Sequence, residues 1–278
     1  MAEDYKYTVS IPRKRPINQK PPLGAEINWG HPLSKSIVGC WLMNEGGGYT
    51  ARNSALYNYP ATFTTDFSGT PTSTFPYFVG EGVKLHNGWN KISFGKLGFV
   101  DYSSTVLFSY SLLIKLTSFD NLMRLFKKAD DGSYAYFDVS SSSGKIKIDM
   151  RSNTTSLQVI GNTVLPLNKT ILLTIVVGSY TDATKVRIFI NNVEDTYATQ
   201  TNGVGTNIGS YQWQFGSGSK CPIGILKAVY FWKNRALSPS EIQQLYIDPY
   251  CFIKQDYKLY YVAPAATTFT FSPIINIF

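Results

Sequence analysis

The chain has 278 residues with a formal net charge of +8, and 44% of its residues are hydrophobic and 15% aromatic. This composition excludes a disordered polymer, since it supplies enough apolar surface for one large β domain with extensions. No apolar run reaches the ~18 residues of a membrane-spanning helix, so we expect no membrane partner. The first residues, Met1 to Asp4, lack the basic and apolar regions of a secretory leader, which predicts synthesis in the cytoplasm.

The cysteines and the charge narrow the class of protein further. Cys40, Cys221 and Cys251 are odd in number and widely spaced, and they form no CxxC pair. They predict reduced, packed thiols rather than a disulfide framework or a zinc site. The net positive charge favours an anionic partner, but it is spread thinly along the chain. Its one dense cluster is Arg13-Lys14-Arg15.

Residues 1–30 are predicted to form an extended basic arm. Four prolines around the basic cluster hold the backbone near extended or polyproline conformations. Before them Tyr5, Tyr7, Val9 and Ile11 alternate strictly, as in a strand that adds to the sheet edge of another chain. A loose terminus is the alternative.

Residues 31–253 carry the period-two pattern of β-strands. One face of a long strand is formed by Val106, Phe108, Tyr110, Leu112, Ile114 and Leu116. Between residues 145 and 151, Ile146, Ile148 and Met150 are predicted to face inward and the residues around them, including Asp149, outward. The continuous apolar run 171–177 predicts a strand covered on both faces. Strands of this length and spacing predict a two-sheet antiparallel sandwich.

One short helix is predicted near the end of this region. Ser238 is a strong N-cap, and Glu241 lies three residues later, which completes a capping box. Ile242, Leu245 and Tyr246 are expected to form its buried face. We expect this helix to close one end of the sandwich.

Residues 254–278 form an apolar tail punctuated by proline. Exposed, such a tail would be prone to aggregation. We therefore expect it to pack on a neighbouring subunit or partner, with packing against its own domain as the alternative.

Two segments resemble the opening and closing signatures of laminin-G-like jelly rolls, in the concanavalin A-like group of β-sandwiches. The opening segment contains Val38-Gly39, Trp41 and Asn44-Glu45-Gly46. The closing segment contains Gly224, the run 234–238, Glu241-Ile242 and Leu245-Tyr246. The run from Asn28 to Leu33 leading into Val38 resembles a version common in bacteriophage virion proteins. The resemblance implies a structural or adhesive module whose first and last strands pair.

The sequence offers little for catalysis or metal binding. A retaining glycosidase needs two carboxylates roughly 5 Å apart, whereas the strand 145–151 supplies Asp149 alone. His31 and His86 have no metal-ligand spacing around them. We therefore expect no catalytic residue, no metal site and no cofactor.

Two weaker candidates remain for ligand contacts. Asp130 and Asp131 lie in a glycine-containing turn, where a loop calcium and a solvated hairpin are both possible and the hairpin is favoured. Many members of the laminin-G-like family carry an acidic turn residue at the position of Asn53, and its loss here further weakens the hypothesis of a calcium site. Aromatic residues around Trp213 could stack on a sugar, but their alternation with glutamines favours the core.

The sequence thus predicts an all-β jelly roll at residues 31–253, between an N-terminal arm at 1–30 and a C-terminal tail at 254–278. Its predicted function is that of a non-enzymatic virion structural protein, most simply a capsid decoration protein, multi-copy or homo-oligomeric, docked on a major capsid protein or tail component. The alternative is a carbohydrate-binding adhesin module of a phage tail or fibre that binds a cell-surface glycan. The predicted partner-binding residues are Tyr5, Tyr7, Arg13, Lys14, Arg15, Tyr257, Leu259, Phe269, Phe271 and Ile275.

Overall fold

The computed structural model describes residues 8–12, 19–55, 59–65, 76–86, 90–95, 107–119, 123–129, 134–140, 144–151, 156–179, 181–203, 213–216, 221–254 and 257–261. The chain divides into two compact units. The smaller one comprises Met1–Pro16 with Gln255–Phe278, and the larger one is Ile17–Lys254. The described residues 19–30, which composition places in the arm, therefore belong to the larger unit.

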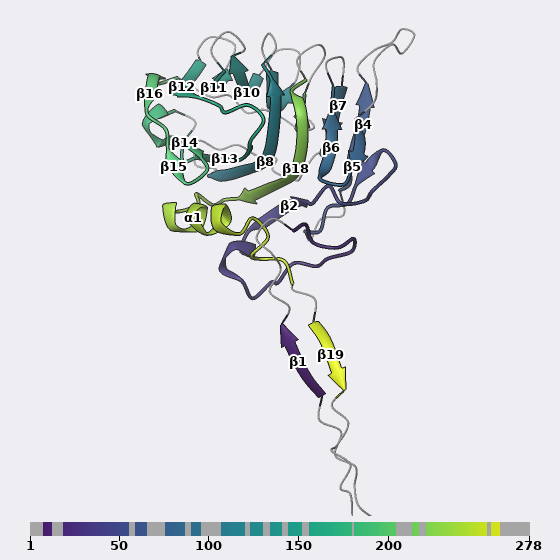
Figure 1. The fold of residues 1–278 in the computed structure, drawn as a ribbon. Coiled ribbons are helices and arrows are strands. Elements are labelled where there is room, and N and C mark those ends of the chain that lie inside the picture. Colours follow the sequence, from purple (N-terminus) through teal and green to yellow (C-terminus); the bar gives the residue numbers. More distant parts are fainter. Residues whose placement is uncertain are drawn as a thin grey trace, which may run out of the picture. The chain divides into compact units, whose positions relative to one another are not determined.

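The smaller unit contains a two-stranded antiparallel sheet. Strand β1 (Thr8–Pro12) pairs with β19 (Tyr257–Tyr261), and Thr8 lies opposite Tyr261 (Figure 1). The alternating segment predicted as a strand near the N-terminus therefore pairs over residues 8–12 with the C-terminal part of its own chain. Whether it also adds to another chain's sheet stays a prediction, and Tyr5 and Tyr7 lie outside the described residues.

The larger unit is an antiparallel β-sandwich, as the sequence predicts, and every pairing among its described strands is antiparallel (Figure 1). In order across the sheet, the nine-stranded sheet contains β16 (Tyr197–Thr201), β12 (Ser156–Val164), β11 (Lys145–Arg151), β10 (Tyr134–Ser140), β9 (Met123–Ala129), β17 (Trp213–Phe215), β7 (Asn90–Ser93), β4 (Ala61–Thr65) and β3 (Thr50–Ala51). The eight-stranded sheet contains β15 (Val193–Glu194), β14 (Val186–Ile190), β13 (Thr170–Val177), β8 (Phe108–Ser118), β18 (Ile223–Lys233), β6 (Gly82–Leu85) and β5 (Tyr77–Val79), with β2 (Ile37–Trp41) paired to β18.

The space between the two sheets holds the main core. The alternating face of β8 points into it, and Phe108, Tyr110 and Leu112 are at most 4% exposed. At its centre the rings of Phe126 and Trp213 stack with their centroids 4.5 Å apart. The aromatic residues around Trp213 that the structure describes thus belong to the core, as the alternation with glutamines predicts.

The outer face of the eight-stranded sheet carries a second apolar cluster. Here Leu172, Tyr230 and Trp232 are buried beneath residues from the N-terminal segment and from helix α1 (Pro239–Ile247). The Trp232 indole Nε1 donates to the Leu33 carbonyl at 2.6 Å, in the short 3₁₀ helix η1 (Pro32–Ser34). Both faces of β13 are buried, as its unbroken apolar run predicts.

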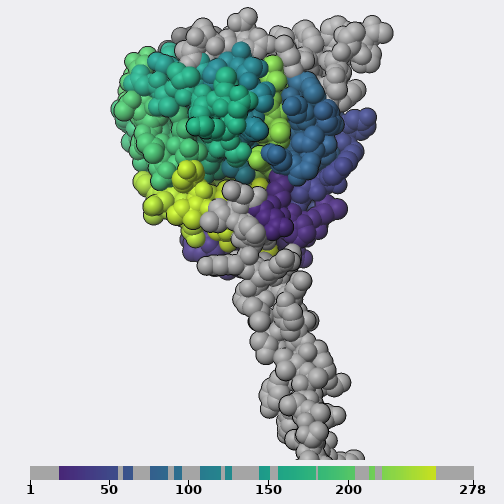
Figure 2. All heavy atoms as spheres, viewed as in Figure 1, coloured from purple at the N-terminus to yellow at the C-terminus, as the bar shows by residue number. Residues whose placement is uncertain are grey.

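Segments from the two ends of the larger unit lie together on the sandwich. In the space-filling view, the purple N-terminal residues cover part of the surface close to the yellow C-terminal segment (Figure 2). Ile27 and Ile253 form an antiparallel bridge, and the Asn28 amide donates to the Phe252 carbonyl at 2.8 Å. Ile27 is only 1% exposed, so this N-terminal segment contributes to the core.

Three details of the predicted elements are confirmed or corrected. The capping box of α1 is present, with the Ser238 hydroxyl accepting from the Glu241 amide. The helix packs on the outer face of the sheet rather than closing an end, and its Tyr246 is 44% exposed instead of buried. Asp149 was expected to face solvent, but it is fully buried, and its carboxylate lies 3.4 Å from the Lys147 ammonium.

The helix cap gives a first testable prediction. We expect Ser238→Ala to lower the free energy of unfolding by about 1 kcal/mol, because an N-cap hydroxyl satisfies an otherwise unpaired backbone amide. Gln243→Ala changes an exposed side chain of the same helix and should stay within about 0.5 kcal/mol of the wild type. Urea unfolding followed by circular dichroism measures both, and equal effects of the two variants would contradict the role of the cap.

Candidate functional site

Strand β18 changes its neighbour in mid-course. One edge pairs with β8 along its length, whereas the other edge pairs first with β6, through Gly224 to Leu226, and then with β2, through Val229 to Trp232. The register against β8 shifts between Leu226 and Ala228, so Lys227 occupies a bulge. Bulges redirect side chains and interrupt pairing. The sheet therefore forks at Lys227, with β6 on one branch and β2 on the other.

The branch formed by β6 approaches β18 very closely. A Cβ atom at Gly82 would lie 2.2 Å from the Leu226 carbonyl oxygen, so only glycine fits at the start of β6. The preceding turn, which contains Gly80 and Glu81, is thereby held beside Lys227. This placement brings the Glu81 carboxylate to 3.0 Å from the Lys227 ammonium.

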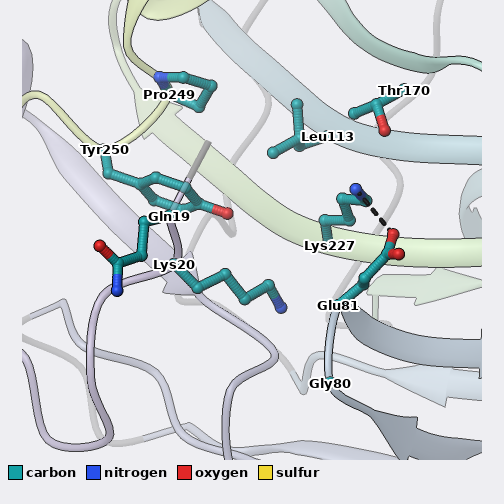
Figure 3. A pocket seen from close by; sticks show the side chains of 9 residues that line it. All are labelled: Gln19, Lys20, Gly80, Glu81, Leu113, Thr170, Lys227, Pro249 and Tyr250. Atoms are coloured by element: carbon teal, nitrogen blue, oxygen red, sulfur yellow. Dashed lines mark ion pairs between the residues drawn. The ribbon is translucent and has the colours of Figure 1, made fainter. Parts of the chain in front are cut away.

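A cavity of about 700 Å³ lies at this fork. It is lined by Gln19, Lys20, Gly80, Glu81, Leu113, Thr170, Lys227, Pro249 and Tyr250. Figure 3 shows the side chains of Lys20 and Tyr250 on one side of this space and the Lys227–Glu81 ion pair on the other. The volume is within the usual range for ligand pockets, and the lining mixes apolar surface with a few polar groups, as such pockets do.

Lys20 is fixed at the end of β2. Its ammonium donates to the carbonyl oxygens of Leu42 at 2.8 Å and of Met43 at 2.7 Å. Met43 has a φ of 51°, a left-handed conformation that is uncommon for a residue other than glycine. This turn of the backbone lets two consecutive carbonyls meet one cation.

Burial makes Lys20 a weak base. It lowers the pKa of the Lys20 ammonium from 10.5 to about 7. The carboxylates of Glu45 and Glu81 act in the opposite direction, and Lys227 adds to the decrease. An ammonium is costly to remove from water, so a buried lysine favours its neutral form. Lys20 therefore changes its charge in the neutral pH range.

The other polar groups of the cavity come from separate elements. The Lys227 side chain is 19% exposed and Glu81 is 58% exposed, and the hydrogen bond to Lys227 is the main cause that lowers the pKa of the Glu81 carboxyl. Tyr250 follows α1, where its amide donates to the Asp248 carboxylate at 2.9 Å. Thr170 begins β13.

A second hollow of about 390 Å³ shares Lys20 and Gly80 with the first. Pro21, Pro22, Leu23, Asn44, Gly46, Phe78 and Val79 complete its lining. The Asn44 side-chain amide donates to the carbonyls of Pro21 and Pro22, each at 2.9 Å, and so fixes the proline segment along it. Because they share Lys20 and Gly80, the two hollows adjoin each other and together offer an extended contact surface.

The lining residues set limits on the chemistry. Glu81 carries the one carboxylate among them, and it is paired with Lys227. Within the described part of the chain, no group of three or more His, Cys, Asp or Glu is placed to hold a metal ion. His31 instead caps η1, where its Nδ1 accepts from the Leu33 amide at 3.1 Å. What the cavity offers is ammonium, amide and hydroxyl groups around an apolar floor.

The partner-binding residues predicted from the sequence lie elsewhere. Tyr257 and Leu259 are in β19, in the smaller unit. Those outside the described residues are Tyr5, Tyr7, Arg13, Lys14, Arg15, Phe269, Phe271 and Ile275. Asp130 and Asp131, the loop-calcium candidates, also lie outside the described residues. Sequence reasoning missed Lys20 and Lys227; the visible signal was a lysine inside the otherwise apolar run of β18.

Two further expectations concern membrane-spanning helices and the three cysteines. Among the described residues, no helix is long and apolar enough to cross a membrane. Cys40, Cys221 and Cys251 form no disulfide, and Cys40 and Cys221 are buried, as predicted. Burial raises the pKa of the Cys221 thiol to about 12, which makes it a poor nucleophile at neutral pH.

Comparison with known proteins identifies the fold and no closer family. No protein-family model matches the chain, and no curated relative was found. Domain 4 of AbnA, a GH43 extracellular arabinanase from Geobacillus stearothermophilus solved in complex with arabinotriose, is similar with a TM-score of 0.52 and 16% identity, over 76% of this chain and 98% of that domain. The binding domain of botulinum neurotoxin serotype G gives a TM-score of 0.51 at 16% identity, over 76% of this chain and 50% of that one.

A sialidase from Trypanosoma rangeli gives a TM-score of 0.55 at 10% identity, over 78% of this chain. The chain spans 33% of that sialidase, so it corresponds to part of the enzyme only. At these identities the likeness shows a shared fold. The chain is a β-sandwich of the jelly-roll class, and these structures are what it is similar to.

Burial of Lys20 gives a second prediction, on stability. Between pH 7 and 10.5 the unfolded chain binds more protons at Lys20 than the folded one, so this residue makes stability rise with pH. Relative to Lys20→Met, the wild type should gain about 2 kcal/mol of unfolding free energy between about pH 6.5 and 8.5. Denaturant unfolding of both proteins at several pH values measures the difference. Parallel pH curves for the two proteins would show that Lys20 titrates like a solvated lysine.

Proposed function

We propose that the chain is a non-enzymatic carbohydrate-binding module, and that the cavity at the fork of β18 is its sugar site. The observation that carries the proposal is the convergence there of Gln19, Lys20, Thr170 and Lys227 from separate elements around an apolar floor. Amide, hydroxyl and ammonium groups are suited to sugar hydroxyls, which both donate and accept hydrogen bonds. A few fixed polar groups in a partly apolar hollow are the usual means of orienting a small ligand.

Similar solved structures support a binding role, and one of them supports a sugar as the ligand. The arabinanase domain that is similar over almost its whole length was solved in complex with arabinotriose, and the neurotoxin domain is a binding domain. The two hollows that share Lys20 and Gly80 would let an oligosaccharide contact the protein through more than one sugar unit.

Binding without hydrolysis is the second part of the proposal. Glycosidases commonly need two carboxylates on opposite sides of the scissile bond. The carboxylate of Glu81 is engaged by Lys227, and the described lining residues supply no second one. Those described residues have the groups for holding a glycan but do not include the pair that would cleave it.

The sugar site is tested by a glycan array on the full chain, followed by calorimetry with the best ligand. We expect Gln19→Ala with Thr170→Val to weaken binding about 25-fold, because two hydrogen bonds of about 1 kcal/mol each are lost. Thr201→Val, an exposed threonine of β16 in the other sheet, is the matched control and should leave binding unchanged. No affinity for any glycan, or unchanged affinity in the double variant, would contradict the proposal.

We also propose that the terminal strands attach this module to a larger assembly, most simply a virion in which the chain is a decoration or tail component. Two observations favour this: the opening residues resemble those of bacteriophage virion proteins, and β1 and β19 pair in a unit of their own. An isolated two-stranded sheet is marginally stable in water, and a partner that covers it would stabilise it. The partners would then be other virion proteins, such as the major capsid protein.

Removing the smaller unit separates attachment from recognition. We expect deletion of residues 1–16 and 255–278 to leave the sandwich folded and able to bind its glycan, because the residues lining both hollows lie within Ile17–Lys254. Incorporation into particles should be lost. Quantitative mass spectrometry of purified particles gives the copy number of each form. Full occupancy by the truncated protein, or absence of the wild type from particles, would contradict the attachment role.

A further inference from the structure

The cavity at the fork of β18 brings together more positive than negative side chains. Lys20 and Lys227 line it from opposite sides, and Glu81 is the one acidic residue among the described residues of its lining (Figure 3). We propose that the glycan recognised here is acidic, and that the carboxylate of one sugar unit binds between Lys20 and Lys227. This inference rests on the proposed function and specifies its ligand class.

The Lys20 ammonium is positioned before any ligand arrives. An ammonium has three N–H donors, and in the described structure two of them are directed to the carbonyls of Leu42 and Met43. The side chain is therefore held in one orientation at little further entropic cost on binding. A carboxylate in the cavity would accept the third donor as a charge-assisted hydrogen bond.

Lys227 is held differently, by an ion pair that a ligand can replace. Its partner Glu81 lies on a turn and is 58% exposed, so the carboxylate of Glu81 can be solvated by water when it leaves Lys227. Exposed ion pairs contribute little net free energy. A sugar carboxylate could therefore take the place of the Glu81 carboxylate on Lys227, whereas a neutral sugar could not.

Binding of an acidic sugar should also be coupled to protonation of Lys20. The charged groups that act on Lys20 are Glu45 and Glu81, which favour its protonated form, and Lys227, which disfavours it; Lys115 acts on Glu81 in turn. Because burial brings the pKa of Lys20 to about 7, part of the population is neutral at pH 7 to 8. A bound carboxylate favours the ammonium form, so binding in this range should take up a proton.

The test compares matched acidic and neutral probes on the full chain by calorimetry: trigalacturonate against galactotriose, and 3′-sialyllactose against lactose. We expect at least one acidic probe to bind tenfold or more tightly than its neutral counterpart at pH 6.5. Which pair shows the preference distinguishes a uronate from a sialic acid. The preference should fall severalfold by pH 8.5, and titrations at pH 7.5 in two buffers of different ionisation enthalpy should reveal net proton uptake.

Variants assign the effect to this site. Lys20→Met and Lys227→Met should each weaken acidic binding far more than neutral binding, and so abolish most of the acidic preference. Glu81→Gln should strengthen acidic binding two- to threefold. Lys145→Met removes the same charge from β11 in the other sheet and should change nothing. Thermal melts check that each variant is folded, and Lys227→Gln is a second substitution should Lys227→Met fail to fold.

The outcomes separate this inference from the proposed function. If acidic and neutral probes bind equally at every pH, the acidic specificity is wrong while the sugar site stands. An equal loss of preference in Lys145→Met would mean that net charge, and not the cavity, selects the ligand, which would also overturn the inference. If no probe and no array glycan binds, both proposals fail together.

Discussion

Strand β18 sets the arrangement of the sandwich because it pairs with β8 along one edge and with two different strands along the other. Its residues alternate between the core that separates the two sheets and the second apolar cluster on the outer face, so a strand this apolar must be covered on both sides. The N-terminal segment and α1 provide the outer cover. Where β6 gives way to β2, the cover and the pairing are both interrupted, and the cavity lies at this position.

A lysine in the middle of such a strand needs a physical explanation. Burying an unpaired charge costs several kcal/mol in an apolar environment. The bulge at Lys227 avoids this cost by directing the side chain to the fork, where it meets Glu81 and remains partly solvated. Lys20 is less well compensated, since burial outweighs its neighbouring carboxylates. A protein gains no stability from keeping a cation in this position, and perturbed titratable groups in a hollow are typical of functional sites.

The sequence predicts local features here and fails on features that depend on which strands become neighbours. The alternation in β8, the double-sided burial of β13 and the capping box of α1 follow from residue patterns within one element, and all three are confirmed. The pairing of β2 with β18 was predicted from the family resemblance and is also confirmed. Tyr246 was placed on the wrong face of the helix: Ile242 and Leu245 are the buried residues of α1, and Tyr246 is exposed.

The cavity escaped prediction for the same reason. Lys20 lies in a proline-rich stretch that composition assigns to an arm. Its carbonyl partners Leu42 and Met43 come directly after β2, so the contact depends on how the arm folds back onto that strand. Burial of Asp149 beside Lys147 likewise departs from the period-two pattern, which places this residue on the solvent face. A charged residue within an apolar strand, as at Lys227, is the signal that sequence reading can use. It marks the position where pairing is interrupted, although not what that opening contains.

The division of the chain into two units separates the proposed sugar site from the terminal strands proposed for attachment. The described lining residues of both hollows lie within Ile17–Lys254, whereas β1 and β19 join the two ends of the chain in the smaller unit. Because the first and last described strands pair with each other, a change in one terminal strand must be matched in the other, but it need not disturb Lys20 or Lys227. Under the proposed function, the residues of the sugar site and the strands proposed for attachment lie in different units. Substitutions that alter the proposed sugar specificity would then leave the proposed attachment strands unchanged.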